Sequence, residues 1–323
     1  MKAVVYTHYG PPDVLQLKDV EKPEPGLNEI LVKVHAATVN RTDNATTKAI
    51  PFFARIITGL FRPKRTTPGT EFAGEVDAIG TAVKAFKVGD RVFGFDDQGS
   101  KAQAEYLVIR EEFATTIPGE ISYEQAAASC EGAHYARNFI NKVKIEPGQH
   151  VLVYGASGAI GSAMVQLLKA MQVNVTAVCG MRNVELVSSL GADRVIDYTK
   201  QDFRKDSQRF DYVFDAVGKI SFFHCRHLLN RGGAYISSDL GRIAQNMYLP
   251  LLTSIFKPLL GGKYTVFPFP TDIPATLALV KKLMQEKRFT AVIDRRYPLD
   301  RIVEAYRYVE QGHKTGNVII TVI

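Results

Sequence analysis

The 323-residue sequence is poor in cysteine and has no long apolar run. Its three cysteines, Cys130, Cys179 and Cys225, lack paired spacing, which argues against a disulfide framework and favours a reducing cytosol. The most apolar segments, residues 52–61 and 247–260, are too short or too interrupted to span a bilayer, which needs about 20 apolar residues. The first residues show no signal-peptide pattern either, so we expect a cytoplasmic protein.

The charge balance is mildly basic, with 40 lysines and arginines against 33 acidic residues and a net charge of +7. Such a balance can favour anionic partners. No nucleic-acid-binding motif is present and the two signs are interspersed, so we expect a solvated surface and no nucleic-acid partner. A hydrophobic fraction of 46% is typical of a folded chain, and this length predicts two domains.

Two patterns of secondary structure follow one another along the chain. The first part has strand-like runs such as EILVKVHAATV and EFAGEVDAIG, separated by Gly and Pro turns, which predicts a mostly antiparallel β domain. From about residue 123 a helical stretch over 123–143 precedes strand-like runs that alternate with helical ones, which predicts βαβ units and a parallel sheet. Two helices from about Pro274 and a final strand, NVIITVI, close the sequence. We expect that strand to return to the first domain.

A glycine-rich turn at residues 151–161, VLVYGASGAIG, lies between a predicted strand and a predicted helix. Gly158 would let backbone N–H groups approach a pyrophosphate, and Gly161 would let the helix pack closely on the strand. Such a turn can also be a plain connection, but the strand, turn and helix context favours a dinucleotide site. The residues predicted to contact the cofactor here are Ala156, Ser157, Gly158, Ala159 and Ile160.

The absence of an acidic residue after the glycine-rich turn indicates which dinucleotide binds. NAD sites usually carry an acidic residue about 20 residues after the glycines to hold the ribose. No acidic residue occurs between Gly161 and Arg182, and the Arg182 guanidinium can pair with a 2′-phosphate. The sequence therefore predicts NADP(H), although Arg182 could instead be an exposed residue at a helix start.

Several longer segments resemble one family almost from end to end. They are AATVNRTD at 36–43, PGTEFAGEVDAIG at 68–80, KVGDRVFGF at 87–95, the segment 144–170, ELVSSLGADRVIDY at 185–198, FDYVFDAVGK at 210–219 and the closing GHKTGNVII. The chain resembles medium-chain dehydrogenases/reductases of the zinc-independent quinone oxidoreductase branch. The resemblance implies a GroES-like β domain from residues 1–122 and 268–323, and a Rossmann domain with a doubly wound parallel sheet from residues 123–267.

Zinc-dependent relatives place a cysteine, a histidine and a second cysteine at positions that match Asn40, Thr70 and, within about one residue, Cys130. A single thiolate cannot hold Zn²⁺, which takes N and S ligands in tetrahedral geometry. We therefore expect no metal, and without a Lewis acid alcohol oxidation becomes the weaker hypothesis. What remains is hydride delivery to an electrophilic acceptor, a small hydrophobic quinone or α,β-unsaturated carbonyl.

The resemblance also implies roles for single residues. Asn40 would lie at the nicotinamide end and is the candidate catalytic residue, with fixation of its own loop as the alternative; Asp43 is expected to cap or brace the backbone. His134 and Tyr135 depart from the family pattern, and we expect His134 to be a packed helix residue. Further cofactor contacts, by matching, are Cys179, Tyr198, Val217, Gly218, Ser238 and Lys314. Tyr198 could instead be a core aromatic.

The segment FFARIITGLFRPKR at residues 52–65 has apolar residues at a helical spacing followed by a basic tail. It could be a lid or wall for a hydrophobic acceptor, a membrane-surface contact, or a segment that packs against residues 247–260. The leading hypothesis is an NADPH-dependent quinone or enone reductase, expected as a homodimer with possible peripheral membrane contact. A zinc alcohol dehydrogenase and a non-catalytic NADPH-binding protein are the alternatives.

Overall fold

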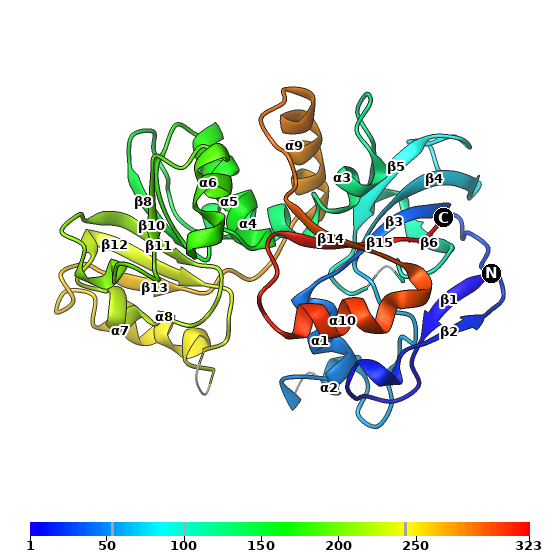
Figure 1. The fold of residues 1–323 in the computed structure, drawn as a ribbon, viewed down its shortest axis with the longest axis horizontal. Coiled ribbons are helices and arrows are strands. Elements are labelled where there is room, and N and C mark those ends of the chain that lie inside the picture. The colour runs from blue at the N-terminus through cyan, green and yellow to red at the C-terminus, as the bar shows by residue number, and fades with distance from the viewer. Residues whose placement is uncertain (53–54, 100, 242–243) are drawn as a thin grey trace. The chain divides into compact units, whose positions relative to one another are not determined.

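The computed structural model describes the whole chain except Phe53, Ala54, Ser100, Arg242 and Ile243 (Figure 1). Contacts divide the chain into two units, unit 1 from Met1–Glu131 with Asp272–Ile323 and unit 2 from Gly132–Thr271. We expected the second domain to begin at residue 123. The boundary instead follows Glu131, because α3 (Tyr123–Ala127) packs against three strands of unit 1.

Unit 1 is built on a mostly antiparallel sheet, as the resemblance implies. Among the described residues the strands run in the order β14-β15-β3-β4-β5-β7, and β6 also pairs with β3; β1 and β2 form a separate antiparallel pair. Only the β14–β15 pairing in this sheet is parallel. The strands are β1 (Lys2–Val5), β2 (Gln16–Asp19), β3 (Glu29–Val39), β4 (Glu71–Ile79), β5 (Arg91–Phe95), β6 (Tyr106–Arg110), β7 (Ala114–Thr116), β14 (Ile293–Pro298) and β15 (Asn317–Thr321).

The C-terminal strand returns to unit 1, which confirms the expectation from the sequence. β15 pairs antiparallel with β3, with Ile320 opposite Ala37, and the side chain of Ile320 is fully buried. The helices of this unit are α1 (Arg41–Lys48), α2 (Arg55–Thr58), α3, α9 (Ile273–Gln285) and α10 (Ile302–Glu310). α10 buries residues at positions i, i+3, i+4 and i+7, namely Ile302, Ala305, Tyr306 and Val309.

Unit 2 contains a parallel sheet with the strand order β10-β9-β8-β11-β12-β13. This is the 3-2-1-4-5-6 order of a Rossmann fold, in which the order reverses between β8 and β11. Figure 1 shows α5 and α6 on one side of this sheet and α7 and α8 on the other. The elements are β8 (His150–Tyr154), α5 (Ala159–Ala170), β9 (Asn174–Cys179), α6 (Val184–Ser189), β10 (Arg194–Asp197), β11 (Phe210–Asp215), α7 (Phe222–Cys225), β12 (Leu229–Ser237), α8 (Gln245–Ile255) and β13 (Tyr264–Val266).

One predicted helix is divided in two. The sequence predicts a helix over residues 123–143, whereas α3 ends at Ala127 and α4 (Glu131–Ile140) begins after a break. At that break, side chains form hydrogen bonds with backbone groups. Glu71 Oε2 accepts from the N–H of Glu131 at 2.7 Å, and Asn317 Nδ2 donates to the carbonyl of Ala128 at 3.1 Å. The break therefore brings Glu131 to a buried carboxylate.

The remaining turns are short 3₁₀ helices at Pro12–Val14, Glu111–Phe113, Met181–Asn183, Phe203–Lys205 and Leu299–Arg301. In the part of the chain that the structure describes, every helix falls short of the length and apolarity that crossing a bilayer requires. All three cysteines are free and buried.

Candidate functional site

The glycine-rich turn of unit 2 has the shape of a phosphate-binding loop. Gly155 follows β8 with φ +83°, a left-handed conformation that favours glycine. A Cβ on Gly161 would lie 2.2 Å from the carbonyl oxygen of Gly155, so α5 packs directly on the turn. A Cβ on Gly158 would meet nothing closer than 3.6 Å, which leaves open space outside the loop before the N-terminus of α5. The residues present fit a pyrophosphate.

The loop after β11 lies against this turn. A Cβ on Gly155 would come within 2.1 Å of Val217 Cγ2, so Val217 packs on the glycine. The N–H groups of Val217 and Gly218 donate to Asp215 Oδ1 at 2.9 and 2.8 Å, which fixes the loop. The structure thus brings these two predicted contacts to the point where the strand order reverses, whereas Ser238 follows the end of β12.

Three further predicted contacts gather at the end of β9. Cys179 ends the strand and is buried, and burial raises the pKa of its thiol to about 11. Arg182 lies exposed in the turn that follows, and Tyr198 N–H donates to the carbonyl of Cys179 at 3.1 Å. The Tyr198 side chain is 56% exposed, so the interpretation as a core aromatic is wrong.

A cavity of about 460 Å³ opens beside Tyr198. Its lining contains three basic side chains, Lys200, Arg204 and Lys219, and is completed by Tyr154, Tyr198, Thr199, Gln201, Asp202, Phe203, Ile220 and His224. Sequence reasoning found only Tyr198 among these residues. The available signal was the run of basic residues that follows β10 in the segment YTKQDFRK.

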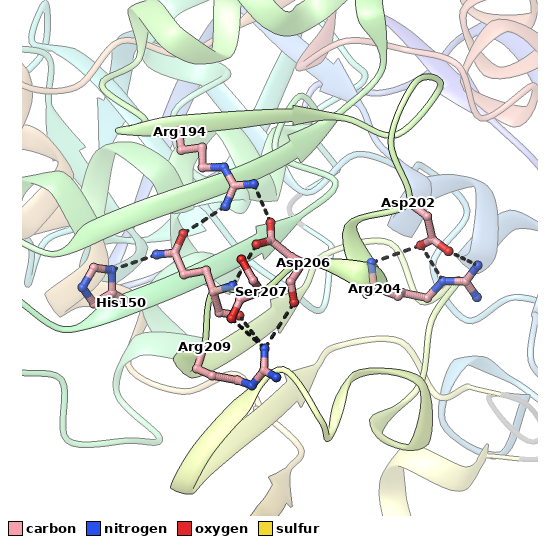
Figure 2. Close-up of polar contacts among 8 residues, drawn as sticks. His150, Arg194, Asp202, Arg204, Asp206, Ser207 and Arg209 are labelled. Atoms are coloured by element: carbon pink, nitrogen blue, oxygen red, sulfur yellow. Dashed lines mark hydrogen bonds and ion pairs between the residues drawn. The ribbon is translucent and has the colours of Figure 1, made fainter.

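Ion pairs hold the segment that walls this cavity (Figure 2). Arg204 Nε lies 2.8 Å from Asp202 Oδ1, and Arg194 Nη2 lies 2.6 Å from Asp206 Oδ2. Burial alone would raise the pKa of Asp206, but the hydrogen bond from Arg194 and the N–H of Gln208 lower it. Gln208 in turn contacts His150 Nδ1 at 3.1 Å and accepts from Arg194 at 3.0 Å. These contacts therefore fix the segment after β10 to the first residue of β10, Arg194, and to the first residue of β8, His150.

In unit 1, Asn40 occupies the position before the first turn of α1. Its backbone N–H donates to Asp43 Oδ2 at 2.8 Å, so Asp43 caps the helix as the sequence suggests. The Asn40 side chain is 4% exposed. Its Nδ2 donates to Glu71 Oε1 at 2.7 Å and to Glu131 Oε2 at 3.2 Å. Asn40 therefore joins carboxylates from two other elements and does more than fix its own loop.

The two glutamates form the centre of a buried polar cluster. Glu131 accepts from the hydroxyls of Thr42 at 2.6 Å and Thr70 at 2.8 Å. Glu71 accepts from the Thr38 hydroxyl at 2.7 Å in addition to Asn40 and the Glu131 N–H. Burial, and then the charge of Glu131, raise the pKa of Glu71 to about 7.

Sequence reasoning missed both glutamates. Each directly follows a residue that matches a zinc ligand of relatives, Glu71 after Thr70 and Glu131 after Cys130. This adjacency could have revealed them. Thr70 and Cys130 are expected to lie close together in the fold, so the glutamates beside them are expected to share one hydrogen-bond network.

Lys314 joins this cluster from the C-terminal loop. Its Nζ donates to Asn40 Oδ1 at 3.3 Å and to the carbonyl of Gly316. Burial lowers the pKa of Lys314 to about 8, although the charges of Glu131 and Glu71 oppose that shift. The structure thus brings together Asn40 and Lys314, which the sequence selected separately. By contrast, His134 is buried in α4, where its Nε2 lies 3.3 Å from Asn138 Nδ2, as expected of a packed helix residue.

The residues at the matching zinc-ligand positions do not fit zinc. Asn40 and Thr70 donate their amide and hydroxyl hydrogens to the two glutamates. Burial, and then the charge of Glu71, hold the pKa of Cys130 well above its usual value, which disfavours the thiolate that zinc needs. No group of three or more His, Cys, Asp or Glu suited to a metal occurs among the residues that the structure describes.

A cavity of about 560 Å³ in unit 1 reaches this cluster through Thr70 and Asp43. Its other lining residues are Tyr6, Thr46, Thr58, Lys64, Arg65, Thr67, Pro68, Gly69, Asp97, Gln98 and Gly99.

The lining of this cavity includes Thr58, Lys64 and Arg65 of the segment 52–65, whereas the described large apolar side chains of that segment are not among the lining residues. Phe52, Ile56, Leu60 and Phe61 are 72%, 75%, 53% and 86% exposed. The expected helix is limited to α2, Arg55–Thr58, and Phe53 and Ala54 lie outside the described residues. The Tyr9 hydroxyl donates to Thr58 Oγ1 and to the Gly59 carbonyl, which ties this turn to the N-terminal part of unit 1.

Comparison with known proteins gives a consistent result. Residues 26–119 match the alcohol dehydrogenase GroES-like domain, and residues 190–320 match a domain described as zinc-binding dehydrogenase. The chain is 32% identical over 339 residues to a chloroplastic quinone-oxidoreductase homolog of Spinacia oleracea, covering 99% of this chain and 98% of that protein. It is 30% identical to an NADPH-dependent alkenal/one oxidoreductase of Arabidopsis thaliana, covering 99% and 79%.

Among solved structures, the quinone oxidoreductase from Coxiella burnetii matches with a TM-score of 0.84 and 26% identity, covering 100% of this chain and 99% of that one. The curated relatives, the domain matches and the two-unit architecture agree. The chain belongs to the medium-chain dehydrogenase/reductase family, in its branch of quinone oxidoreductases and enone reductases.

Proposed function

We propose that this protein is an NADPH-dependent reductase that delivers hydride to a quinone or an α,β-unsaturated carbonyl without a metal. One observation carries the proposal. Asn40 and Thr70, at positions that match zinc ligands of relatives, donate hydrogen bonds to Glu71 and Glu131. An alkoxide substrate would have no Lewis acid there, whereas quinones and enones are already electrophilic. Relatives named as quinone and alkenal/one oxidoreductases support this choice of acceptor.

Unit 2 supplies the residues that would hold the cofactor, which provides a hydride at nicotinamide C4 when bound. The turn around Gly158, from Ala156, Ser157, Ala159 and Ile160, and the N-terminus of α5 would bind the pyrophosphate. Val217, Gly218 and Ser238 would border the cofactor along the strand ends, with Cys179 at the end of β9. Arg182, in the turn after β9, and Tyr198, which lines the cavity of about 460 Å³, would bind the 2′-phosphate end.

Unit 1 would hold the acceptor in the cavity that Thr70 lines. The Thr70 hydroxyl lies 2.8 Å from Glu131 Oε2, a distance at which a proton can pass between the cavity and the buried cluster. Asn40 acts as a positioning residue, because it holds Glu71, Glu131 and Lys314 in one network. The Lys314 ammonium adds the positive charge that a developing oxyanion needs nearby.

We further propose a homodimer and a cytoplasmic, reducing location with peripheral membrane contact. The edge strand β13 packs on α8, whose side chains Leu251 and Ile255 are 67% and 62% exposed. An exposed apolar face beside a free strand edge suits pairing with a second copy. Three free cysteines fit a reducing compartment.

The activity itself can be tested with a panel of acceptors. NADPH oxidation should be fast with quinones and 2-alkenals and slow with saturated aldehydes or alcohols plus NADP⁺. NMR spectra of the 2-alkenal product check where hydride is delivered: a saturated aldehyde is expected, and its isomer of equal mass, the allylic alcohol, would show delivery to the carbonyl carbon. Turnover confined to alcohols would support the alcohol dehydrogenase alternative, and binding of NADPH without any turnover would support the non-catalytic one.

Arg182→Ala should remove most of the preference for NADPH over NADH. In the unchanged protein we expect NADPH to bind about tenfold more tightly, or about 1.4 kcal/mol, because no acidic residue follows the glycine turn before Arg182. Calorimetric titration measures both affinities. Arg110→Ala, at an exposed residue of β6, is the control and should leave the ratio unchanged. Equal binding of the two cofactors by the unchanged protein would contradict the assignment.

The Lys314 charge predicts a pH dependence. With the pKa of Lys314 lowered to about 8, the ammonium is lost as pH rises through that value, and kcat/KM should fall with it. Lys314→Met should be slower and flat over this range, and Lys314→Arg should keep activity at higher pH. A fall of the same shape in Lys314→Met would assign the titration to another group.

The lowered pKa of Lys314 also predicts how the free energy of unfolding changes with pH. A folded pKa below the unfolded value means that the charged lysine destabilises the fold at pH values below about 8, and that this cost fades as pH rises toward the ordinary lysine pKa. Lys314→Met should therefore gain stability over the unchanged protein at neutral pH and lose that gain in alkali. Urea midpoints over this pH range give a readout independent of turnover.

A further inference from the structure

Residues 48–65 of unit 1, of which the structure describes all but Phe53 and Ala54, carry several exposed apolar and basic side chains, and we call the described residues the 48–65 segment. Besides the four apolar side chains described above, Ile50 is 59% exposed. Five large apolar side chains in a short stretch form a patch of the kind that soluble surfaces keep for an interaction.

The charged side chains of the 48–65 segment are all basic. No aspartate or glutamate occurs between Asp43 and Glu71, whereas Lys48, Arg55, Arg62, Lys64 and Arg65 lie there. Lys48 pairs with Glu310, and Arg65 bonds to the carbonyls of Gln98 and Gly99. The exposed Arg62 and Lys64 make no ion pair within the described part of the structure. Their charges are available to an anionic partner.

The segment is held in place on the domain. Tyr9 Oη donates to Thr58 Oγ1 at 2.9 Å and to the Gly59 carbonyl at 2.8 Å, and the N–H of Lys64 donates to the Thr58 carbonyl at 2.8 Å. The Arg55 guanidinium lies 4.9 Å from the ring centroids of both Tyr9 and Phe52. The apolar side chains are therefore presented from a turn with fixed backbone hydrogen bonds.

The same segment borders the cavity of unit 1. Thr58, Lys64 and Arg65 line the space of about 560 Å³ whose inner end is Thr70. If Phe61 or Ile56 inserted into an apolar layer, a compound dissolved in that layer would be close to the opening of the cavity. The exposed patch and the proposed acceptor site are thus continuous along the chain.

We propose that the 48–65 segment docks unit 1 on an anionic phospholipid surface and that an apolar acceptor enters the cavity from that surface. The second half rests on the proposed reductase activity; the first deepens the membrane contact proposed above and does not depend on that activity. Apolar side chains beside unpaired basic ones match the acyl and headgroup regions of an anionic leaflet. A lipid surface suits the segment better than a protein partner, because the one helix among its described residues, α2, is a single turn, too short for the regular apolar stripe by which a helix docks in a protein groove.

Co-sedimentation with vesicles tests the docking without any substrate. The full-length protein should bind vesicles of phosphatidylglycerol and phosphatidylcholine more tightly than vesicles of phosphatidylcholine alone, and binding should weaken as salt is added. Ile56→Ser with Phe61→Ser, and separately Arg62→Ser with Lys64→Ser, should each weaken binding about tenfold or more. Leu27→Ser with Val88→Ser is the matched control, since these side chains are 69% and 61% exposed elsewhere on unit 1.

Equal binding to both vesicle types, or equal loss in the control pair, would overturn the docking. Thermal unfolding of each variant shows that the fold is kept. For the entry step, the Ile56→Ser and Phe61→Ser pair should lower kcat/KM about tenfold for a quinone embedded in anionic vesicles and leave a water-soluble enone unaffected. Equal effects on both acceptors would overturn entry from the surface, whereas no turnover with either acceptor would overturn the proposed function and leave the docking result standing.

Discussion

The site in unit 1 depends on the cost of burying two carboxylates. Glu71 is fully buried and Glu131 is 5% exposed, and an ionised carboxylate without partners is among the most costly groups to bury. The donors that offset this cost come from separate elements: Thr38 and Asn40 at the end of β3, Thr42 in α1, and Thr70 before β4. Two of these donors, Asn40 and Thr70, occupy positions where zinc-dependent relatives place ligands, so satisfying the carboxylates and holding a metal there are alternatives.

This constraint also explains the local fold. The N–H of Glu131 donates to Glu71, which separates α3 from α4, and Lys314 reaches Asn40 only because β15 returns the C-terminal loop to the sheet of unit 1. The cluster is closed by residues distant in sequence. In unit 2 the equivalent constraint is close packing at Gly155 and Gly161, where a side chain on either would collide with Val217 or with the turn itself.

The sequence predicts the parts of this structure that are local. Alternation of strands and helices predicts the parallel sheet, and the glycine spacing predicts the tight turn between β8 and α5. The return of β15 to unit 1 joins distant segments, and it agrees with the resemblance, which implies a first domain built from both chain ends. The Glu71 and Glu131 cluster escaped prediction, because single charged residues in apolar runs do not show which distant donors they meet. The apolar residues at 52–61 suggested a cavity wall, but the side chains of Phe52, Ile56, Leu60 and Phe61 are exposed. The residues of this segment that line the cavity are Thr58, Lys64 and Arg65.

We propose that hydrogen bonding to buried glutamates takes the place of metal ligation at this site. The most direct test of this proposal is NADPH-dependent reduction of a quinone or enone by protein dialysed exhaustively against EDTA and phenanthroline, with metal content measured on the same sample. The account predicts that turnover is unchanged when no zinc remains. Loss of turnover on chelation, restored by adding Zn²⁺, would contradict it.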